Sequence, residues 1–211
     1  MKILINRPDK PFARFIFAHG AGANKQSHFM EQIAKLLCLG GVEVVRFDFP
    51  YMLRAAEKNK RQPPDRANIL LQDFTEMVNS ADTELPLFIG GKSMGGRMAS
   101  MLESAGTVEN VNLIKGVICL GYPFHPPGKP EKQRTEHLYD AKLPILIIQG
   151  ERDTFGNRSR VESYQLPSII DVQFLAAADH SFVPLKSSGI GVDEHIRSAA
   201  DQIIKFMKGQ I

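Results

Sequence analysis

The chain has 211 residues and a mass of 23.5 kDa, and its 26 Lys and Arg against 23 Asp and Glu leave a net charge of +3. Its hydrophobic share of 43% and charged share of 23% are ordinary for a globular protein and exclude a disordered or collagen-like chain. A pI near 8.8 falls short of a nucleic-acid-binding signature, so we expect no nucleic-acid partner. The length suits one domain, which we expect to span residues 1–211.

Short apolar runs alternate along the chain with longer amphipathic segments. The runs predict strands, because each is rich in Val, Ile, Leu or Phe and ends near Gly, Pro or Asp. They cover Ala13–Ala18, Val42–Phe47, Pro86–Ile89, Ile114–Leu120, Leu143–Gln149 and Ile169–Leu175, with Met1–Asn6 as a candidate edge strand. The amphipathic segments predict helices over His28–Leu39, Arg66–Asn79, Met94–Ser104, Arg134–Ala141, Arg158–Tyr164 and Asp193–Lys208. This alternation is typical of a mostly parallel sheet with helices on both faces.

The sharpest motif is Gly91-Lys92-Ser93-Met94-Gly95, which reads G-x-S-x-G. A predicted strand ends just before it and a predicted helix begins within it, as in the strand–turn–helix elbow that presents a nucleophilic serine. The same letters contain G-K-S, the end of a phosphate-binding P-loop. That motif needs glycine at position 86, where this chain has Pro86, so we favour Ser93 as a nucleophile.

A serine nucleophile needs a base, and the base needs an orienting carboxylate. With a G-x-S-x-G elbow, the acid and then the histidine follow the serine along the chain, each at a strand end. Asp153 and His180 each follow a predicted strand and have this order. We therefore predict Ser93, His180 and Asp153 as a catalytic triad, with Glu151 as the second choice for the acid.

The turn His19-Gly20-Ala21-Gly22-Ala23 directly follows the strand Ala13–Ala18. In proteins with the elbow, this turn supplies one backbone N–H of an oxyanion hole, and the residue after the nucleophile supplies the other. By position these donors are Ala21 and Met94, with Gly22 as the nearest substitute. An ordinary glycine-rich turn remains the alternative.

Several other polar residues have plainer interpretations. We expect His195 to be a solvated residue of the last helix, and His137 and His28 to be structural. A basic segment lies before the helix Arg66–Asn79, and a solvated loop is favoured there over a docking site for an acidic partner. Its charged residues are Arg54, Lys58, Lys60, Arg61 and Arg66.

The two cysteines, Cys38 and Cys119, each lie in an apolar run. We expect free buried thiols in a reducing compartment rather than a disulfide. No apolar stretch approaches the roughly 18 residues of a membrane span, and no signal segment is visible, so we expect a cytoplasmic protein that does not contact a membrane. Metal-ligand spacings and a dinucleotide fingerprint are also missing, so no metal or cofactor is expected.

Four segments in this order carry a resemblance to a known family. They are Ala18–Gly22, Arg46-Phe47-Asp48-Phe49-Pro50, Gly91–Arg97 and Gly121–Pro130. The chain resembles small bacterial α/β-hydrolase-like proteins of the dienelactone-hydrolase branch, which are related to a eukaryotic regulatory subunit of a chromatin-modifying complex. The resemblance covers nearly the whole chain and implies an α/β-hydrolase fold with a sheet of about seven strands.

The resemblance and the three motif residues together predict a serine hydrolase. It would cleave a small carboxylic ester or thioester through an acyl-enzyme on Ser93, with water as the second substrate. The alternative is a non-catalytic module that keeps the fold for binding. Neither the substrate nor the oligomeric state follows from the sequence.

The resemblance also places any lid after the strand Ile114–Leu120. This chain has only Gly121 to Gln133 there, broken by prolines and glycines, so we expect no cap domain. Tyr122 and Phe124 are then expected to form a shallow open wall beside the nucleophile, and Gly22 is expected to belong to the same substrate pocket. Such a pocket favours acetate to butyrate esters, since a longer chain would stay unburied.

Overall fold

Seven apolar runs pair into one sheet in the computed structural model, which describes residues 3–81, 84–105 and 113–211. The strands are Ile3–Asn6 (β1), Ala13–Ala18 (β2), Val42–Phe47 (β3), Leu87–Lys92 (β4), Ile114–Leu120 (β5), Ile145–Gly150 (β6) and Ile170–Leu175 (β7). All seven lie where the sequence predicts strands, although Met1 and Lys2 of the expected edge strand are outside the described residues. The backbone of β2 to β7 is therefore specified by local apolar runs.

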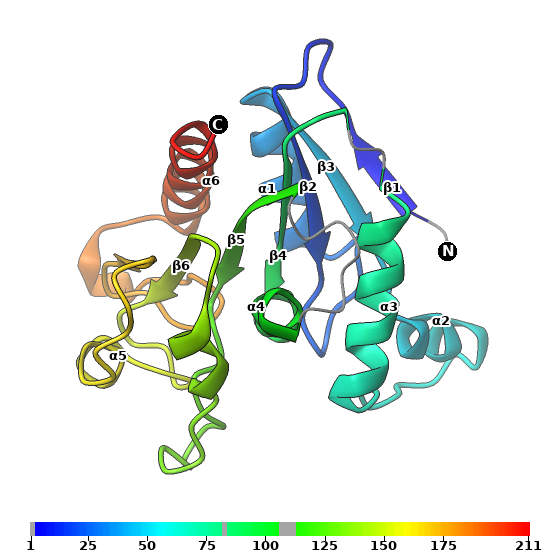
Figure 1. Cartoon of the computed structure of the whole chain (residues 1–211). Coiled ribbons are helices and arrows are strands. Elements are labelled where there is room, and N and C mark those ends of the chain that lie inside the picture. The colour runs from blue at the N-terminus through cyan, green and yellow to red at the C-terminus, as the bar shows by residue number, and fades with distance from the viewer. Residues whose placement is uncertain (1–2, 82–83, 106–112) are drawn as a thin grey trace.

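The strand order β1-β3-β2-β4-β5-β6-β7 decides where a site can form. All pairs are parallel except β1 with β3. The chain moves from β2 outward to β3 and then crosses back, so that β4 lies on the other side of β2 (Figure 1). A crevice opens at the carboxyl ends of the strands where the order reverses. Here that point lies between β2 and β4, the strands that precede the glycine-rich turn and Ser93.

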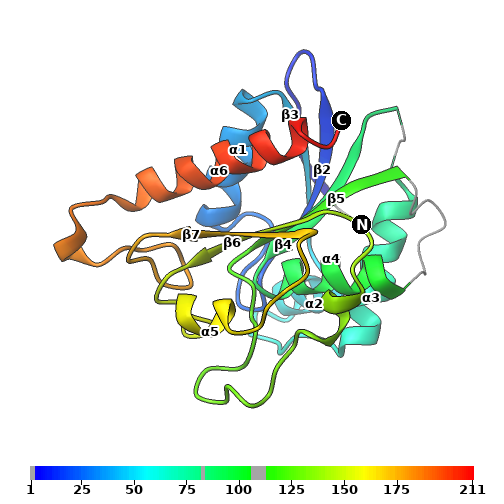
Figure 2. The ribbon, with the colours of Figure 1, turned by 60° about the vertical axis from the view of Figure 1, so that its left-hand side comes forward.

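Helices cover both faces of the sheet. They are His28–Leu39 (α1), Pro50–Glu57 (α2), Ala67–Asn79 (α3), Met94–Ala105 (α4), Arg158–Glu162 (α5) and Val192–Lys208 (α6), with short 3-10 helices at Glu136–Asp140 (η2) and Lys186–Ser188 (η3). Figure 2 shows α1 and α6 on one face, and α2 to α5 on the other. Each face has its own apolar core, with Phe15 and Ile203 in the first and Phe74 and Leu102 in the second. A sheet buried on both faces holds its strand ends rigidly.

Three elements differ from the sequence-based prediction. Strand β4 begins at Leu87 and runs on to Lys92 instead of ending at Ile89, because Gly90 to Lys92 continue the parallel pairing with β5. The predicted helix at Arg134–Ala141 is only the 3-10 helix η2. The expected segment Arg158–Tyr164 is helical up to Glu162, and Asn157 caps it by accepting a hydrogen bond from the N–H of Arg160.

The basic segment is only partly a loop. Residues 50–57 form α2, which the sequence analysis missed, with Pro50 at its first turn, where a missing N–H costs nothing. Arg54 lies on this helix and donates to Asp65 Oδ1 at 2.6 Å. The remaining basic side chains Lys58, Lys60, Arg61 and Arg66 are exposed, as the solvated interpretation predicts.

His195 is buried rather than solvated, which corrects the sequence-based expectation. Only 4% of its surface is exposed. Its Nδ1 lies 3.1 Å from the carbonyl oxygen of Phe182, in the loop after β7. The first turns of α6 pack on that loop, so a residue that looks like part of a polar helix face becomes a structural contact.

Three further observations concern the surroundings of the sheet. Residues 121–135, all of them described, contain no helix, in keeping with the prediction that no cap follows β5. Cys38 is partly exposed and Cys119 is buried, and both are free thiols. Within the described ranges, no helix combines the length and apolar character needed to cross a membrane.

Candidate active site

Ser93 occupies a sharp turn between β4 and α4. Its φ of 51° lies in the left-handed region, which a non-glycine residue adopts only under constraint. The constraint is visible in the backbone, because the Ser93 N–H donates to the carbonyl of Leu120 at 2.9 Å and its carbonyl accepts from the Arg97 N–H at 3.0 Å. A Cβ on either Gly91 or Gly95 would lie 2.5 Å from the carbonyl oxygen of Ala18, so the elbow fits only with glycine there.

His180 reaches the serine from a tight loop after β7. Its Nε2 lies 2.9 Å from Ser93 Oγ. The loop is fixed by Asp179, whose Oδ1 accepts from the N–H groups of Ser181 and Val183 at 2.8 and 3.0 Å. Phe182 follows with a φ of 66° and a fully buried ring. The backbone hydrogen bonds of this loop therefore fix the position of His180.

Asp153 orients the imidazole from the other side. Its Oδ2 lies 2.7 Å from His180 Nδ1 and accepts from Gln149 Nε2 at 2.9 Å, while its Oδ1 accepts from the Phe155 N–H at 2.7 Å. The carboxylate is 1% exposed. These bonds assign the proton of a neutral His180 to Nδ1, which leaves Nε2 free to accept from the serine hydroxyl.

Glu151, the second choice for the acid, faces elsewhere. One of its oxygens accepts from Arg158 Nη1 at 2.9 Å and the other from the Ala177 N–H at 2.7 Å. These hydrogen bonds lower the pKa of Glu151, the bond from Ala177 most strongly. Its contacts with α5 and the loop after β7 are those of a structural residue.

The charge state of His180 is set by competing effects. Burial lowers its pKa, the hydrogen bond to Asp153 raises it, and the positive charge of Lys92 lowers it again. The Lys92 ammonium donates to the carbonyl oxygen of His180 at 2.6 Å and lies 5.4 Å from the ring centres of both Phe29 and Phe182. Burial lowers the pKa of Lys92 itself to about 8. A neutral imidazole at pH 7 is the form that can accept a proton.

The glycine-rich turn lies against the elbow. A Cβ on Gly20 would be 3.7 Å from Ser93 Cβ. His19 is fully buried, and its Nε2 accepts from the Phe49 N–H at 3.1 Å, so the proton is assigned to Nδ1, 2.8 Å from the carbonyl oxygen of Gly20. Burial lowers the pKa of His19, which keeps this arrangement uncharged. Ala21, one of the two expected oxyanion donors, follows in an exposed position, and its carbonyl accepts from Tyr51 Oη at 3.0 Å.

Met94, the second expected donor, is the first residue of α4. The first N–H groups of a helix have no acceptor within the helix, and the helix dipole favours negative charge beside them. Met94 is partly exposed and follows Ser93 directly, which is the chain position predicted for an oxyanion donor. The expected substitute Gly22 is exposed, and a Cβ there would lie 3.7 Å from Arg61 Nη2.

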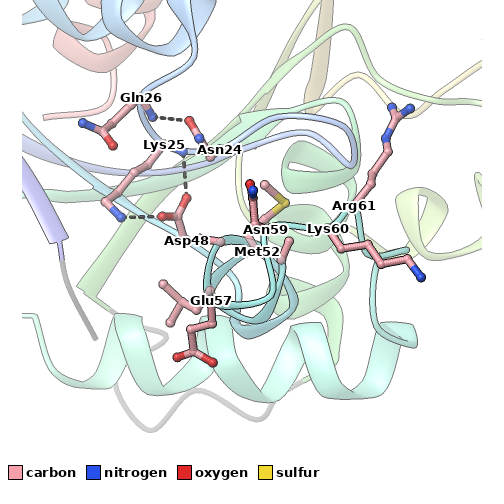
Figure 3. A pocket seen from close by; sticks show the side chains of 12 residues that line it. Asn24, Lys25, Gln26, Asp48, Met52, Glu57, Asn59, Lys60 and Arg61 are labelled. Carbon is pink, nitrogen blue, oxygen red and sulfur yellow. Dashed lines mark hydrogen bonds and ion pairs between the residues drawn. The ribbon is translucent and has the colours of Figure 1, made fainter.

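A polar cavity of about 740 Å³ adjoins the far end of this turn (Figure 3). Asp48 faces Lys25 within it and accepts hydrogen bonds from both the Lys25 N–H and the Lys25 ammonium. Lys60 and Arg61 point away from this pair. This ion pair connects the glycine-rich turn to Asp48, which follows β3. It helps to hold residues 19–25 in place.

The expected substrate wall at Tyr122 and Phe124 is wrong. Both side chains are fully buried, with ring centres 4.7 Å apart. The chain reverses at Gly121, and the loop that carries Asp153 covers the pair, since a Cβ on Gly156 would lie 2.7 Å from Phe124 Cδ2. The rings belong to the core because residues that follow 30 positions later close over them, which a local pattern does not reveal.

Phe155 is an aromatic residue that lies beside His180. Its ring centre lies 4.3 Å from that of His180, and its side chain is partly exposed. The sequence analysis also missed the roles of His19, Gln149 and Lys92. A signal existed for Gln149 and Lys92, because each is a polar residue at the carboxyl end of an otherwise apolar strand, where functional groups gather in α/β proteins.

Other chemistry has no corresponding cluster in the part of the chain that the structure describes. No group of three or more His, Cys, Asp or Glu side chains converges there as a metal site would require. The sequence pattern supports no nucleotide loop, since residues 87–89 are buried in β4.

A serine at a strand–helix elbow, linked through histidine to a buried aspartate on this sheet, is the arrangement of α/β hydrolases. A model of the alpha/beta hydrolase domain family matches residues 11–208, and the chain belongs to this family. A Schizosaccharomyces pombe protein provisionally named a monoglyceride lipase is 33% identical over 130 residues, which are 58% of this chain and 32% of that protein. The chain therefore covers about a third of this curated relative.

Solved structures agree on the fold. Est1E from Butyrivibrio proteoclasticus, described with ferulic acid bound, superposes with a TM-score of 0.73 at 13% identity, over 99% of this chain and 94% of the other. The dienelactone hydrolase from Anabaena variabilis gives 0.70 at 18% identity, over 97% of this chain and 89% of the other. At such identities the likeness concerns the fold, so the substrate has to be argued from the site.

Proposed function

We propose that this α/β hydrolase is a serine hydrolase that cleaves a carboxylic ester or thioester. The observation that carries the proposal is the continuous set of contacts from Ser93 Oγ to His180 Nε2 at 2.9 Å and from His180 Nδ1 to Asp153 Oδ2 at 2.7 Å. A nucleophile, its base and an orienting acid within hydrogen-bond distance are the requirement for acyl transfer.

In the proposed reaction, Ser93 Oγ attacks the carbonyl carbon while His180 Nε2 takes its proton. Asp153 stabilises the imidazolium that forms and keeps the ring in place. The imidazolium then gives the proton to the leaving alcohol or thiol, which leaves an acyl group on Ser93. Water, activated by the same histidine, releases the acid and restores the serine. No cofactor is required for these steps.

The developing oxyanion is assigned to the N–H groups of Ala21 and Met94. Loss of one such donor costs about 3 kcal/mol of transition-state stabilisation in enzymes of this mechanism. The contacts that support this assignment are the close approach of residue 20 to Ser93 and the position of Met94 at the start of α4. His19 contributes by holding the turn through Phe49.

An ester substrate is also consistent with the names of similar proteins, a monoglyceride lipase among them. The cytoplasmic location, the extent of the domain and the independence from nucleic acid and membrane remain predictions from the sequence.

The alternative is a non-catalytic binding module. No specific contact favours it, because such a module has no need of a neutral histidine between a serine and a buried carboxylate.

A fluorophosphonate probe tests the proposal directly. It should label Ser93 covalently, as identified by mass spectrometry of the modified peptide, and Ser93→Ala should abolish labelling while leaving the thermal midpoint nearly unchanged. Ser159→Ala is the matched control, since this serine on α5 is exposed and its hydroxyl donates to Asn157 Oδ1 at 3.1 Å, not to a residue of the triad. Equal labelling of wild type and Ser93→Ala would refute the assignment of Ser93, whereas a wild type that is not labelled at all would favour the binding module.

A further inference from the structure

An apolar cavity of about 310 Å³ lies beside the candidate active site. Its walls come from the glycine-rich turn, the first turns of α1 and α6, and the loop after His180. The residues that line it are Gly20, Ala23, Ser27, His28, Phe29, Met30, Gln32, Lys92, Ser181, Val183, Val192 and Ile196. None of the residues that the sequence analysis assigned to a substrate pocket is among them.

The cavity is lined in part by chain neighbours of the catalytic residues. Lys92 immediately precedes Ser93, and Ser181 immediately follows His180, so two of its walls are chain neighbours of the nucleophile and the base. A third wall is Gly20, at which a Cβ would lie 3.7 Å from Ser93 Cβ. The cavity lining thus includes the chain neighbours of the nucleophile and the base, and it approaches Ser93 at Gly20.

Most of the lining surface is apolar, and two of the five polar side chains there, Gln32 and Lys92, already donate hydrogen bonds to Asp193 and His180. The Lys92 ammonium is bound to the His180 carbonyl, and its Cγ would lie 3.7 Å from a Cβ on Gly20, so its stem borders the cavity on that side. Val183 and Val192 line the same cavity and are 46% and 40% exposed, so apolar surface is open at its rim. Exposed apolar surface gathered at a cavity is typical of a site that an apolar ligand covers.

We infer that this cavity takes an unbranched alkyl chain of the substrate ester, of up to about eight carbon atoms. That the substrate is an ester rests on the proposed function, whereas the alkyl chain is inferred from the cavity. At about 30 Å³ for each water-sized group, the volume holds roughly ten such groups. An alkyl chain fits because most of the lining surface is apolar, and burying a charged group against such surface is unfavourable. This replaces the short-chain preference expected from Tyr122 and Phe124.

Two ester series decide from which side the chain enters. The first lengthens the acyl group of p-nitrophenyl esters from acetate to dodecanoate, and the second lengthens the alcohol of alkyl acetates over the same range. In the series that uses the cavity, kcat/KM should rise by up to about fourfold per CH₂ to about eight carbons and then level off or fall. Flat or falling profiles in both series, with acetate still cleaved in a Ser93-dependent way, would overturn the cavity while sparing the function.

Val192→Phe narrows the cavity from the exposed end of α6. It should reduce the ratio of octanoate to acetate turnover, or the equivalent ratio in the alcohol series, by about tenfold or more. Val183→Phe, on the opposite wall, should act in the same direction. Leu39→Phe is the matched control, because Leu39 is 78% exposed at the far end of α1 and does not line the cavity. A ratio that changes equally in all three variants would contradict the inference.

A binding measurement separates the cavity from the chemistry. Titration calorimetry on Ser93→Ala should detect 1-octanol binding at least about tenfold tighter than 1-butanol, and Val192→Phe in that background should remove the difference. This result would support the alkyl site even if the wild type cleaved no ester. Equal or undetectable binding of the two alcohols would overturn it.

Discussion

Asp153 and Lys92 place opposite charges on two sides of His180. The buried carboxylate contacts Nδ1, while the ammonium contacts the carbonyl oxygen of the same residue. The two charges push the pKa of the imidazole in opposite directions, and burial lowers it further. At the scale of single residues, these effects thus keep His180 neutral, and the neutral imidazole can accept a proton.

The first prediction at this scale separates the two acids. Asp153→Asn should lower kcat by about 10⁴-fold, because the amide cannot stabilise the imidazolium and favours the wrong tautomer. Glu151→Gln should change kcat only a few-fold, since Glu151 contacts Arg158 and Ala177 rather than His180. Ester hydrolysis by both variants, with circular dichroism to verify folding, checks the ranking. The reverse order would move the acid to Glu151.

The second prediction concerns the charge of Lys92. Removal of a nearby positive charge raises the pKa of His180, and kcat/KM requires the neutral form. Lys92→Met should therefore shift the acidic limb of the kcat/KM–pH profile to higher pH. Lys92→Gln, which keeps a hydrogen-bond donor but not the charge, should shift the limb in the same direction. If the acidic limb of the profile moved in neither variant, the charge of Lys92 would have no effect on the pKa of His180.

At the scale of elements, the site depends on how closely β4 and α4 approach β2. The elbow brings α4 against the end of β2, where a Cβ on Gly95 would meet the Ala18 carbonyl at 2.5 Å and the His19 oxygen at 2.8 Å. Both obstacles are backbone atoms that cannot rotate away. The packing of two elements, rather than one side chain, sets the distance from the glycine-rich turn to Ser93.

Gly95→Ala tests this close approach. Overpacking of this kind costs about 1–3 kcal/mol of the free energy of unfolding, and the displaced turn should lower kcat by about 10²-fold. Urea denaturation and ester hydrolysis measure the two effects. Gly191→Ala is the control, because a Cβ there meets nothing within 4 Å and its φ of −89° is open to alanine. Similar losses in both variants would contradict the argument.

At the scale of the whole molecule, the sheet separates two apolar cores and seals its central strands. Cys119 on β5 is fully buried, and its Sγ lies 3.3 Å from the Gly96 carbonyl oxygen. Burial raises its pKa well above the usual range, so the thiol is both inaccessible and unreactive. Cys38 on α1 is partly exposed, and its pKa is raised only by modest burial.

Thiol reactivity should therefore report the integrity of the sheet. A thiol reagent at neutral pH should modify Cys38 in the native protein, whereas Cys119 should react at least about 10³-fold more slowly, through global unfolding. Cys38→Ser should remove the fast phase, and urea should restore reaction of Cys119. Rapid modification of both thiols in the native protein would mean that the sheet opens locally.

The positions of the strands and the chain order of the site residues could be predicted without the structure. Apolar runs such as Ala13–Ala18 and Ile114–Leu120 have the composition of strands buried on both faces, so their positions follow from local burial. Parallel strands also end at one edge of a sheet, which is why the spacing of Ser93, Asp153 and His180 was enough to expect them near one another.

Which side chains contact one another could be seen only in the folded protein. Asp153 and Glu151 are two residues apart, and the turn between them alone directs one carboxylate to His180 and the other to Arg158. Tyr122 and Phe124 follow a strand end as functional residues often do, but the later loop closes over them and the exposed apolar surface lies instead at Val183 and Val192. Burial of a side chain depends on segments remote in sequence, and local periodicity carries no information about them.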